Sequence, residues 1–286
     1  MDKLYSCEWE PIHVCNYRCP YCPYPWHSPE LALRHKECTT EDWISFWQRI
    51  FERYGEFLIR VSGGEPSLHG GFIRMMAAIS RHHRMEIITN LSWDVERAAG
   101  VKPKNIKFVG SYHPHFVALE TFRKKILSLK EMGFEVLVRV VGYPPIMKDI
   151  PKIHEEFASV GVTVRDNSFF GEYNGRVYPE SYTDDDRAWL NAKAVVQKKP
   201  YKMNLGLESP QGRLCETGVR YMRLYPDGEA YRCARVQVSI GNIKDKNFQL
   251  LKEAAPCPVE HCYCDAEHFY LKDVDQDAFY KKAASA

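Results

Sequence analysis

The chain has 286 residues, of which 45% are hydrophobic and 27% are charged, and its formal net charge is +2. This length leaves room for one large domain and one small domain, and the composition is that of a folded globular protein. The charge balance offers no concentrated basic patch, so we expect no nucleic acid partner. No segment reaches the ~18 apolar residues of a membrane span, and no signal peptide pattern is present, so we expect a cytoplasmic protein with no membrane partner.

Short β-branched or aromatic runs alternate with helical patterns up to about residue 170. The expected strands lie at residues 10–14, 57–62, 86–89, 106–111, 135–141 and 162–165. The expected helices lie at residues 41–54, 71–82, 95–99, 118–132 and 150–160. This alternation predicts an α/β fold with a parallel sheet inside a helical layer, curved into a partial (β/α)6 TIM-like barrel. Ligands of such folds bind where the strands end.

The pattern changes after residue 176. A polar connector with one helix at 184–197 precedes the segment RYMRLYPDGEAYRC, which is typical of a β-hairpin around a Pro-Asp-Gly turn. We therefore expect a barrel over residues 1–205, a small C-terminal hairpin and helix domain that carries cysteines over residues 206–270, and a tail helix within 271–286.

Ten cysteines exceed what packing needs, and a reducing compartment argues against a disulfide framework. Cys15, Cys19 and Cys22 fall in the segment CNYRCPYC, just after the first expected strand. Three thiolates in one loop suit an iron-sulfur cluster with one iron left open. The alternatives are a zinc site completed by His13 or His27, or three unrelated cysteines.

This spacing resembles the CxxxCxxC signature of the radical S-adenosylmethionine (SAM) superfamily. The resemblance implies a SAM-binding 4Fe-4S cluster on these three cysteines, whose open iron chelates S-adenosyl-L-methionine. It also implies reductive cleavage of SAM to a 5′-deoxyadenosyl radical, with the electron coming from a flavodoxin-type or ferredoxin-type reductant.

Motifs after the later strands fit the same family. A Gly-Gly-Glu-Pro segment follows the second strand, and Thr-Asn follows the third, with Leu91 where the family usually has glycine. The resemblance implies that the following residues bind SAM: Gly63, Gly64, Glu65, Pro66, Thr89, Asn90, Ser111 and Arg139. In this role the glycines let the backbone approach SAM closely. Glu65 accepts a hydrogen bond from the ammonium group of SAM, and Arg139 binds the SAM carboxylate. Alternatively these are an ordinary loop, a helix cap and a structural ion pair.

Five polar residues are expected at the open mouth of the barrel, where they could orient substrate or accept a proton: His113, His115, Asp166, Glu172 and Tyr173. Glu172 and His113 are the candidate catalytic residues. Each of the five could equally be a structural or solvated loop residue.

Five further cysteines surround the hairpin: Cys215, Cys233, Cys257, Cys262 and Cys264. With the Pro-Asp-Gly turn and the following Ile-Gly-Asn-Ile at residues 240–243, they resemble the SPASM/Twitch extension of radical SAM enzymes. The resemblance implies a second, auxiliary 4Fe-4S cluster on four of the five. The spacing leaves open which of the last three bind, and structural zinc is the alternative.

Together these features predict a radical SAM oxidoreductase that abstracts a substrate hydrogen atom and oxidises a small molecule such as a sugar or nucleoside. Two alternatives remain. One is a maturase that modifies a peptide or protein side chain, and the other is an iron-sulfur or zinc-binding module without catalysis.

Overall fold

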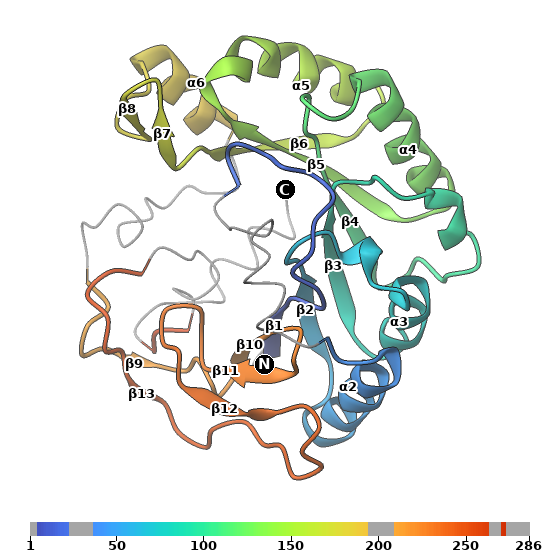
Figure 1. Ribbon diagram of the computed structural model, residues 1–286, viewed down its shortest axis with the longest axis vertical. Coiled ribbons are helices and arrows are strands. Elements are labelled where there is room, and N and C mark those ends of the chain that lie inside the picture. The colour runs from blue at the N-terminus through green and yellow to red at the C-terminus, as the bar shows by residue number, and fades with distance from the viewer. Residues whose placement is uncertain (1–4, 23–36, 194–208, 263–269, 273–286) are drawn as a thin grey trace.

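The computed structural model describes residues 5–22, 37–193, 209–262 and 270–272, and the structural statements below concern these residues. Its main feature is a nine-stranded sheet with the strand order β12-β11-β10-β1-β2-β3-β4-β5-β6. The first six strands are β1 (Tyr5–Trp9), β2 (Phe57–Val61), β3 (Arg84–Thr89), β4 (Ile106–Ser111), β5 (Glu135–Gly142) and β6 (Thr163–Ser168). Neighbours among these six strands pair in parallel, and Figure 1 shows the sheet curving with helices on its outer side. The predicted partial (β/α)6 barrel is confirmed.

Helices follow the strands as expected. They are α2 (Thr40–Tyr54), α3 (Phe72–Ile79), α4 (Leu119–Glu131), α5 (Ile150–Ala158) and α6 (Asp184–Lys193), with short 3-10 turns η1 (Pro66–Leu68), η2 (Val95–Ala98) and η3 (Pro144–Asp149). The segment expected as a short helix at 95–99 is thus a 3-10 turn. None of the described helices is long and apolar enough to cross a membrane.

The core lies between the sheet and the helices. Alternate strand residues face outward, so Trp9 of β1 packs on Trp43 and Trp47 of α2, with ring centroids 4.9 and 5.9 Å apart. Helix α2 begins with a capping box between Thr39 and Asp42. The opposite residues of each strand therefore face the barrel interior, where the polar side chains gather.

The first strand was predicted at residues 10–14, and this is wrong. Strand β1 ends at Trp9, and Pro11, which has no N–H to donate to a ladder, begins a loop. The carbonyls of Ile12 and Val14 instead accept hydrogen bonds from the backbone that follows β2. Residues 10–14 form a loop whose backbone is hydrogen-bonded to another loop, and periodicity does not distinguish such a segment from a short strand.

The predicted hairpin is confirmed and extends the main sheet. Strands β10 (Tyr221–Leu224) and β11 (Glu229–Tyr231) pair antiparallel, β12 (Ser239–Asn242) follows, and β10 lies parallel to β1. Gly228 closes the turn with a φ of 84°. The domain boundary near residue 206 stays a prediction.

Two small sheets complete the described structure: β7 (Gly171–Tyr173) with β8 (Arg176–Tyr178), and β9 (Leu214–Cys215) with β13 (Ala255–Pro256). The expected tail helix and the end of the helix expected at 184–197 lie outside the described residues.

Candidate active site

The first cysteine cluster lies on the loop that leaves β1. Cys15, Cys19 and Cys22 are all partly buried, and the Cys22 amide donates to the Cys19 carbonyl at 3.1 Å. Burial raises the pKa of Cys19 to about 12, and the neighbouring Cys22 and Cys15 add to this shift. Thiols that disfavour one another's thiolate forms need a cationic centre to ionise together, so this donor set fits an iron-sulfur cluster.

The Gly-Gly-Glu segment packs directly against this loop. The amides of Gly64 and Glu65 donate to the carbonyls of Ile12 and Val14 at 3.0 and 2.9 Å. A Cβ on Gly63 would lie 2.6 Å from the Ile12 oxygen, and one on Gly64 would collide with the Val14 carbonyl. The glycines therefore allow close approach of the cysteine loop's own backbone, in addition to any ligand.

Replacing Gly64 by alanine is expected to lower the free energy of unfolding by about 1–3 kcal/mol, because the added methyl group overlaps a backbone atom that cannot rotate away. Urea unfolding of the full chain measures this loss. Gly70→Ala is the matched control, since a Cβ there meets no atom within 4 Å. Equal stability of the two variants would contradict the proposed contact.

Glu65 joins the second and third loops. It is 1% exposed, and burial raises its pKa. Its Oε1 accepts from the Thr89 hydroxyl at 2.7 Å and its Oε2 from the Asn90 amide at 2.7 Å. The structure therefore brings the predicted residues of these two motifs together. Asn90 also donates from its side chain to Asn16, beside Cys15, at 2.9 Å.

Ser111, the last residue of β4, lies opposite Arg139 in the middle of β5. Burial lowers the pKa of Arg139, and its Nε has no hydrogen-bond partner within the described part of the chain. Among the described residues Arg139 forms no ion pair of the kind considered from the sequence, so its Nε is left as a donor for a ligand.

His113 contacts the cysteine loop directly. Its Nδ1 lies 2.9 Å from the Tyr21 hydroxyl and 3.4 Å from the Cys19 sulfur, and its ring stacks on Tyr21 at 5.7 Å. Burial lowers the pKa of His113 to about 4, so the ring is neutral. His115 is exposed and lies near Tyr143.

The other residues expected at the mouth lie elsewhere. Asp166 faces outward from β6 and pairs with His154 of α5 at 2.9 Å, because it alternates with the inward-facing Arg165. Glu172 is exposed on the β7–β8 hairpin, and Tyr173 packs on Tyr143 at 5.3 Å. Among the five, His113 has polar contacts with the cysteine loop, and the His115 ring lies 6.1 Å from the Tyr21 ring.

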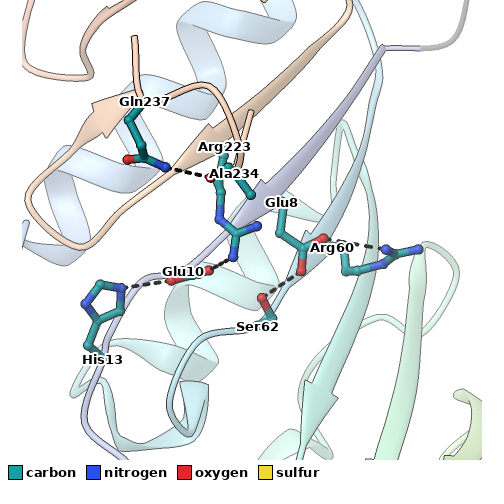
Figure 2. A network of polar contacts seen from close by, with 8 residues as sticks. All are labelled: Glu8, Glu10, His13, Arg60, Ser62, Arg223, Ala234 and Gln237. Atoms are coloured by element: carbon teal, nitrogen blue, oxygen red, sulfur yellow. Dashed lines mark hydrogen bonds and ion pairs between the residues drawn. The ribbon is translucent and has the colours of Figure 1, made fainter. Parts of the chain in front are cut away.

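A buried ionic network connects the hairpin with the cysteine loop. Glu10 is 1% exposed, accepts from Arg223 of β10, and lies 2.8 Å from His13 Nε2. Figure 2 shows Glu10 between these two side chains. His13, one of the two histidines considered as a zinc ligand, is thus engaged by Glu10, and His27 lies outside the described residues.

Replacing Glu10 by alanine is expected to lower the free energy of unfolding by about 3–5 kcal/mol, because it leaves the Arg223 guanidinium buried without its carboxylate. Denaturant titration measures the loss. Glu41→Ala, which breaks the exposed pair with Arg74, should change stability by only about 0.2–1 kcal/mol. Combining Glu10→Leu with Arg223→Met should recover much of the loss. Similar losses for Glu10→Ala and Glu41→Ala would refute this role.

The second group of cysteines surrounds a small cavity. Cys215, Cys233, Cys257 and Cys262 are buried and line the same cavity of about 20 Å³. Cys215 also lies 3.3 Å from the Thr217 hydroxyl, and the Val236 amide donates to the Cys233 sulfur at 3.3 Å. Four buried thiols facing one space fit a fully ligated tetrathiolate centre. Cys264 lies outside the described residues.

Two kinds of centre suit four thiols, an iron-sulfur cluster and a zinc ion. In the described ranges, no three His, Cys, Asp or Glu side chains are arranged as ligands of one metal ion.

The fold and the first loop define a class of protein: a parallel partial barrel with three cysteines after its first strand. Residues 9–110, which include all three cysteines, match the Radical SAM superfamily. This segment of the chain is therefore similar to radical SAM enzymes, a family that implies a 4Fe-4S cluster and SAM as cofactors.

Curated relatives include two proteins named GTP 3′,8-cyclase. The one from Crocosphaera subtropica is 24% identical over 218 residues, which make up 68% of this chain and 64% of that protein. The one from Klebsiella pneumoniae is 32% identical over 101 residues, 33% of this chain and 30% of that protein. The matched part of the chain thus spans less than two thirds of each cyclase.

Solved structures share the fold. The structure of anSMEcpe with bound AdoMet has a TM-score of 0.61 and 18% identity, and the match covers 93% of this chain and 83% of that chain. SuiB from Streptococcus suis has a TM-score of 0.58 and 15% identity, with coverage of 97% and 68%. The structure of anSMEcpe with AdoMet and the Cp18Cys peptide has a TM-score of 0.59 and 18% identity, covering 95% and 84%.

Proposed function

We propose that this chain is a radical SAM oxidoreductase in which Cys15, Cys19 and Cys22 hold the SAM-binding cluster. The observation that carries the proposal is the set of hydrogen bonds that joins the cysteine loop to the Gly63–Glu65 and Thr89–Asn90 segments. Three loops from successive strands are thereby fixed to one another, which is the pre-organisation that a reactive cofactor requires.

A 4Fe-4S cluster held by Cys15, Cys19 and Cys22 would supply the electron for reductive cleavage of SAM, and with it the radical chemistry that removes a hydrogen atom from the substrate. The residues of the chain bind and orient. Arg139 and Ser111 would receive the SAM carboxylate, because the Arg139 guanidinium keeps donors free on the inner face. Asn90 and Gly64 would line the methionyl part, with Glu65 as the anchor of both loops.

His113 is the better supported of the two candidate catalytic residues. It is a neutral ring beside Cys19, where it would shield the cluster from water or accept a proton. Glu172 would act only on a substrate large enough to reach the exposed β7–β8 hairpin.

Cys215, Cys233, Cys257 and Cys262 would hold a second 4Fe-4S cluster, which can accept the electron of a substrate radical and make the net reaction an oxidation. The shared cavity supports this ligand set, and Cys264 lies outside the described residues. Zinc on the same four thiols is the alternative, and it would leave the chain without an internal electron acceptor.

The preferred substrate is a small molecule such as a sugar or nucleoside, and the two cyclases that act on GTP support this class. A peptide is the second candidate, since anSMEcpe has the same fold and binds the Cp18Cys peptide. A flavodoxin-type or ferredoxin-type protein would provide the electrons.

Anaerobic reconstitution of the full chain tests the proposal. Brown protein with iron and sulfide for two clusters, which releases 5′-deoxyadenosine when dithionite and SAM are added, would support it. Colourless protein that contains zinc would support a binding module without catalysis. Deuterium transfer from labelled candidate substrates into 5′-deoxyadenosine would then separate small molecules from peptides.

A further inference from the structure

Charged side chains gather on the inner face of the barrel. Side chains alternate along each strand, and the outward positions of the sheet pack against helices, so the inner row includes Glu8, Arg60, Glu86, Arg139 and Arg165. Electrostatic effects on the Arg139 guanidinium come from the other four residues, which confirms that they lie near one another.

The two carboxylates of this row already have a partner. Arg60 lies 3.5 Å from Glu8 and 3.7 Å from Glu86. Glu8 also accepts from the Ser62 hydroxyl at 2.8 Å, as Figure 2 shows. Glu10, farther along β1, is bound to Arg223 and His13. Glu8, Glu86 and Glu10 are therefore paired with side chains of the protein itself.

Within the described ranges neither of the other two arginines forms an ion pair, although Glu86 and Glu8 are near enough to affect the charge of Arg139. Arg139 and Arg165 are directly opposite each other on β5 and β6. The Nε atoms of both are buried, and within the described ranges neither donates a hydrogen bond to a protein acceptor. Like charges placed opposite each other on one face of a sheet are destabilising, and so are buried donors without acceptors. A local arrangement that costs stability points to a ligand that offsets the cost.

We propose that Arg165 binds an anionic oxygen group of the substrate, a carboxylate or a phosphate, beside the position that Arg139 provides for SAM. This inference rests on the proposed function, which assigns Arg139 to the SAM carboxylate. Guanidinium groups bind both kinds of anion through paired N–H donors, and one arginine for each anion would hold the cosubstrate and the substrate side by side. The substrate class thereby narrows to acidic small molecules, such as sugar acids and phosphorylated sugars or nucleosides.

Calorimetric titration of the reconstituted full chain with inorganic phosphate, and separately with acetate, tests this assignment. Arg165→Gln is expected to weaken binding of the preferred anion at least about tenfold, the equivalent of one lost charged hydrogen bond. Arg165→Lys should retain part of the affinity, which separates loss of charge from misfolding. Arg176→Gln, on the exposed strand β8, is the matched control and should bind like the wild type. Tighter binding of phosphate would indicate a phosphorylated substrate, and tighter binding of acetate would indicate a carboxylate substrate.

SAM titrations on the same samples complete the test. Phosphate or acetate binding that persists with saturating SAM, together with unchanged SAM affinity in Arg165→Gln, supports a separate substrate site. Competition between SAM and the anion, loss of SAM affinity in Arg165→Gln, or equal anion binding by wild type and Arg165→Gln would overturn it. Release of 5′-deoxyadenosine by the wild type is scored separately, so a failure of the radical chemistry is not confused with a failure of the anion site.

Discussion

Cys19→Ala is expected to abolish the cleavage of SAM. The residue is the middle ligand of the proposed cluster, and its sulfur lies among Cys15, Cys22 and His113. With two thiolates left in the loop, a cluster cannot be held with one open iron, and the electron transfer to the sulfonium has no source. Assays with dithionite and SAM should find no 5′-deoxyadenosine above the level without protein.

Cys7→Ala is the matched control for this variant. Cys7 is also near the N-terminus, but it belongs to strand β1 and points into the core, where its exposed fraction is 2%. Its replacement removes one buried sulfur and should cost about 1 kcal/mol of stability while iron content and SAM cleavage remain. Undiminished cleavage in Cys19→Ala, or loss of cleavage in Cys7→Ala as well, would refute the assignment of the cluster to Cys15, Cys19 and Cys22.

Cys233→Ala should separate the two proposed centres. The residue closes the hairpin and lines the cavity shared with Cys215, Cys257 and Cys262, so its loss leaves three thiols for a centre that is expected to use four. Iron and sulfide should fall to about half of the wild-type content because one of two similar clusters is lost. Formation of 5′-deoxyadenosine should continue without substrate oxidation.

The measurement combines iron and sulfide analysis with 5′-deoxyadenosine release on the same sample. Cys38→Ala is the control, since Cys38 is buried beside the hairpin but is absent from the cavity. An unchanged iron content in Cys233→Ala would show that the second cluster does not use this thiol. If the variant loses zinc and not iron relative to the wild type, the centre is the structural zinc site.

Much of the fold was predictable because its elements carry local signals. The Thr39 capping box and the apolar face of α2, and the β-branched run of β4, follow from residues close in sequence. The strand predicted at residues 10–14 was wrong because the backbone of this segment is hydrogen-bonded to another loop. That contact joins positions some fifty residues apart and leaves no trace in local periodicity.

The sequence predicted the motifs of the site but not the contacts between residues that are distant in the chain. The expected sixth strand included Arg165, but no role was predicted for it. Because Arg165 and Asp166 are neighbours in a strand, their side chains must face opposite sides of the sheet. Glu10 and Arg223 lie more than two hundred residues apart, and no local pattern relates them.

The sequence by itself determined the cysteine spacing, the turn chemistry and the order of strands and helices, because these depend on covalent neighbours and on the periods of helix and strand. Tertiary structure alone decided that Glu65 anchors the third loop, that Cys215, Cys233, Cys257 and Cys262 line one cavity, and that Arg139 and Arg165 lie opposite each other. These depend on strand pairing and barrel curvature, which bring distant residues within hydrogen-bonding distance only once the whole sheet has formed.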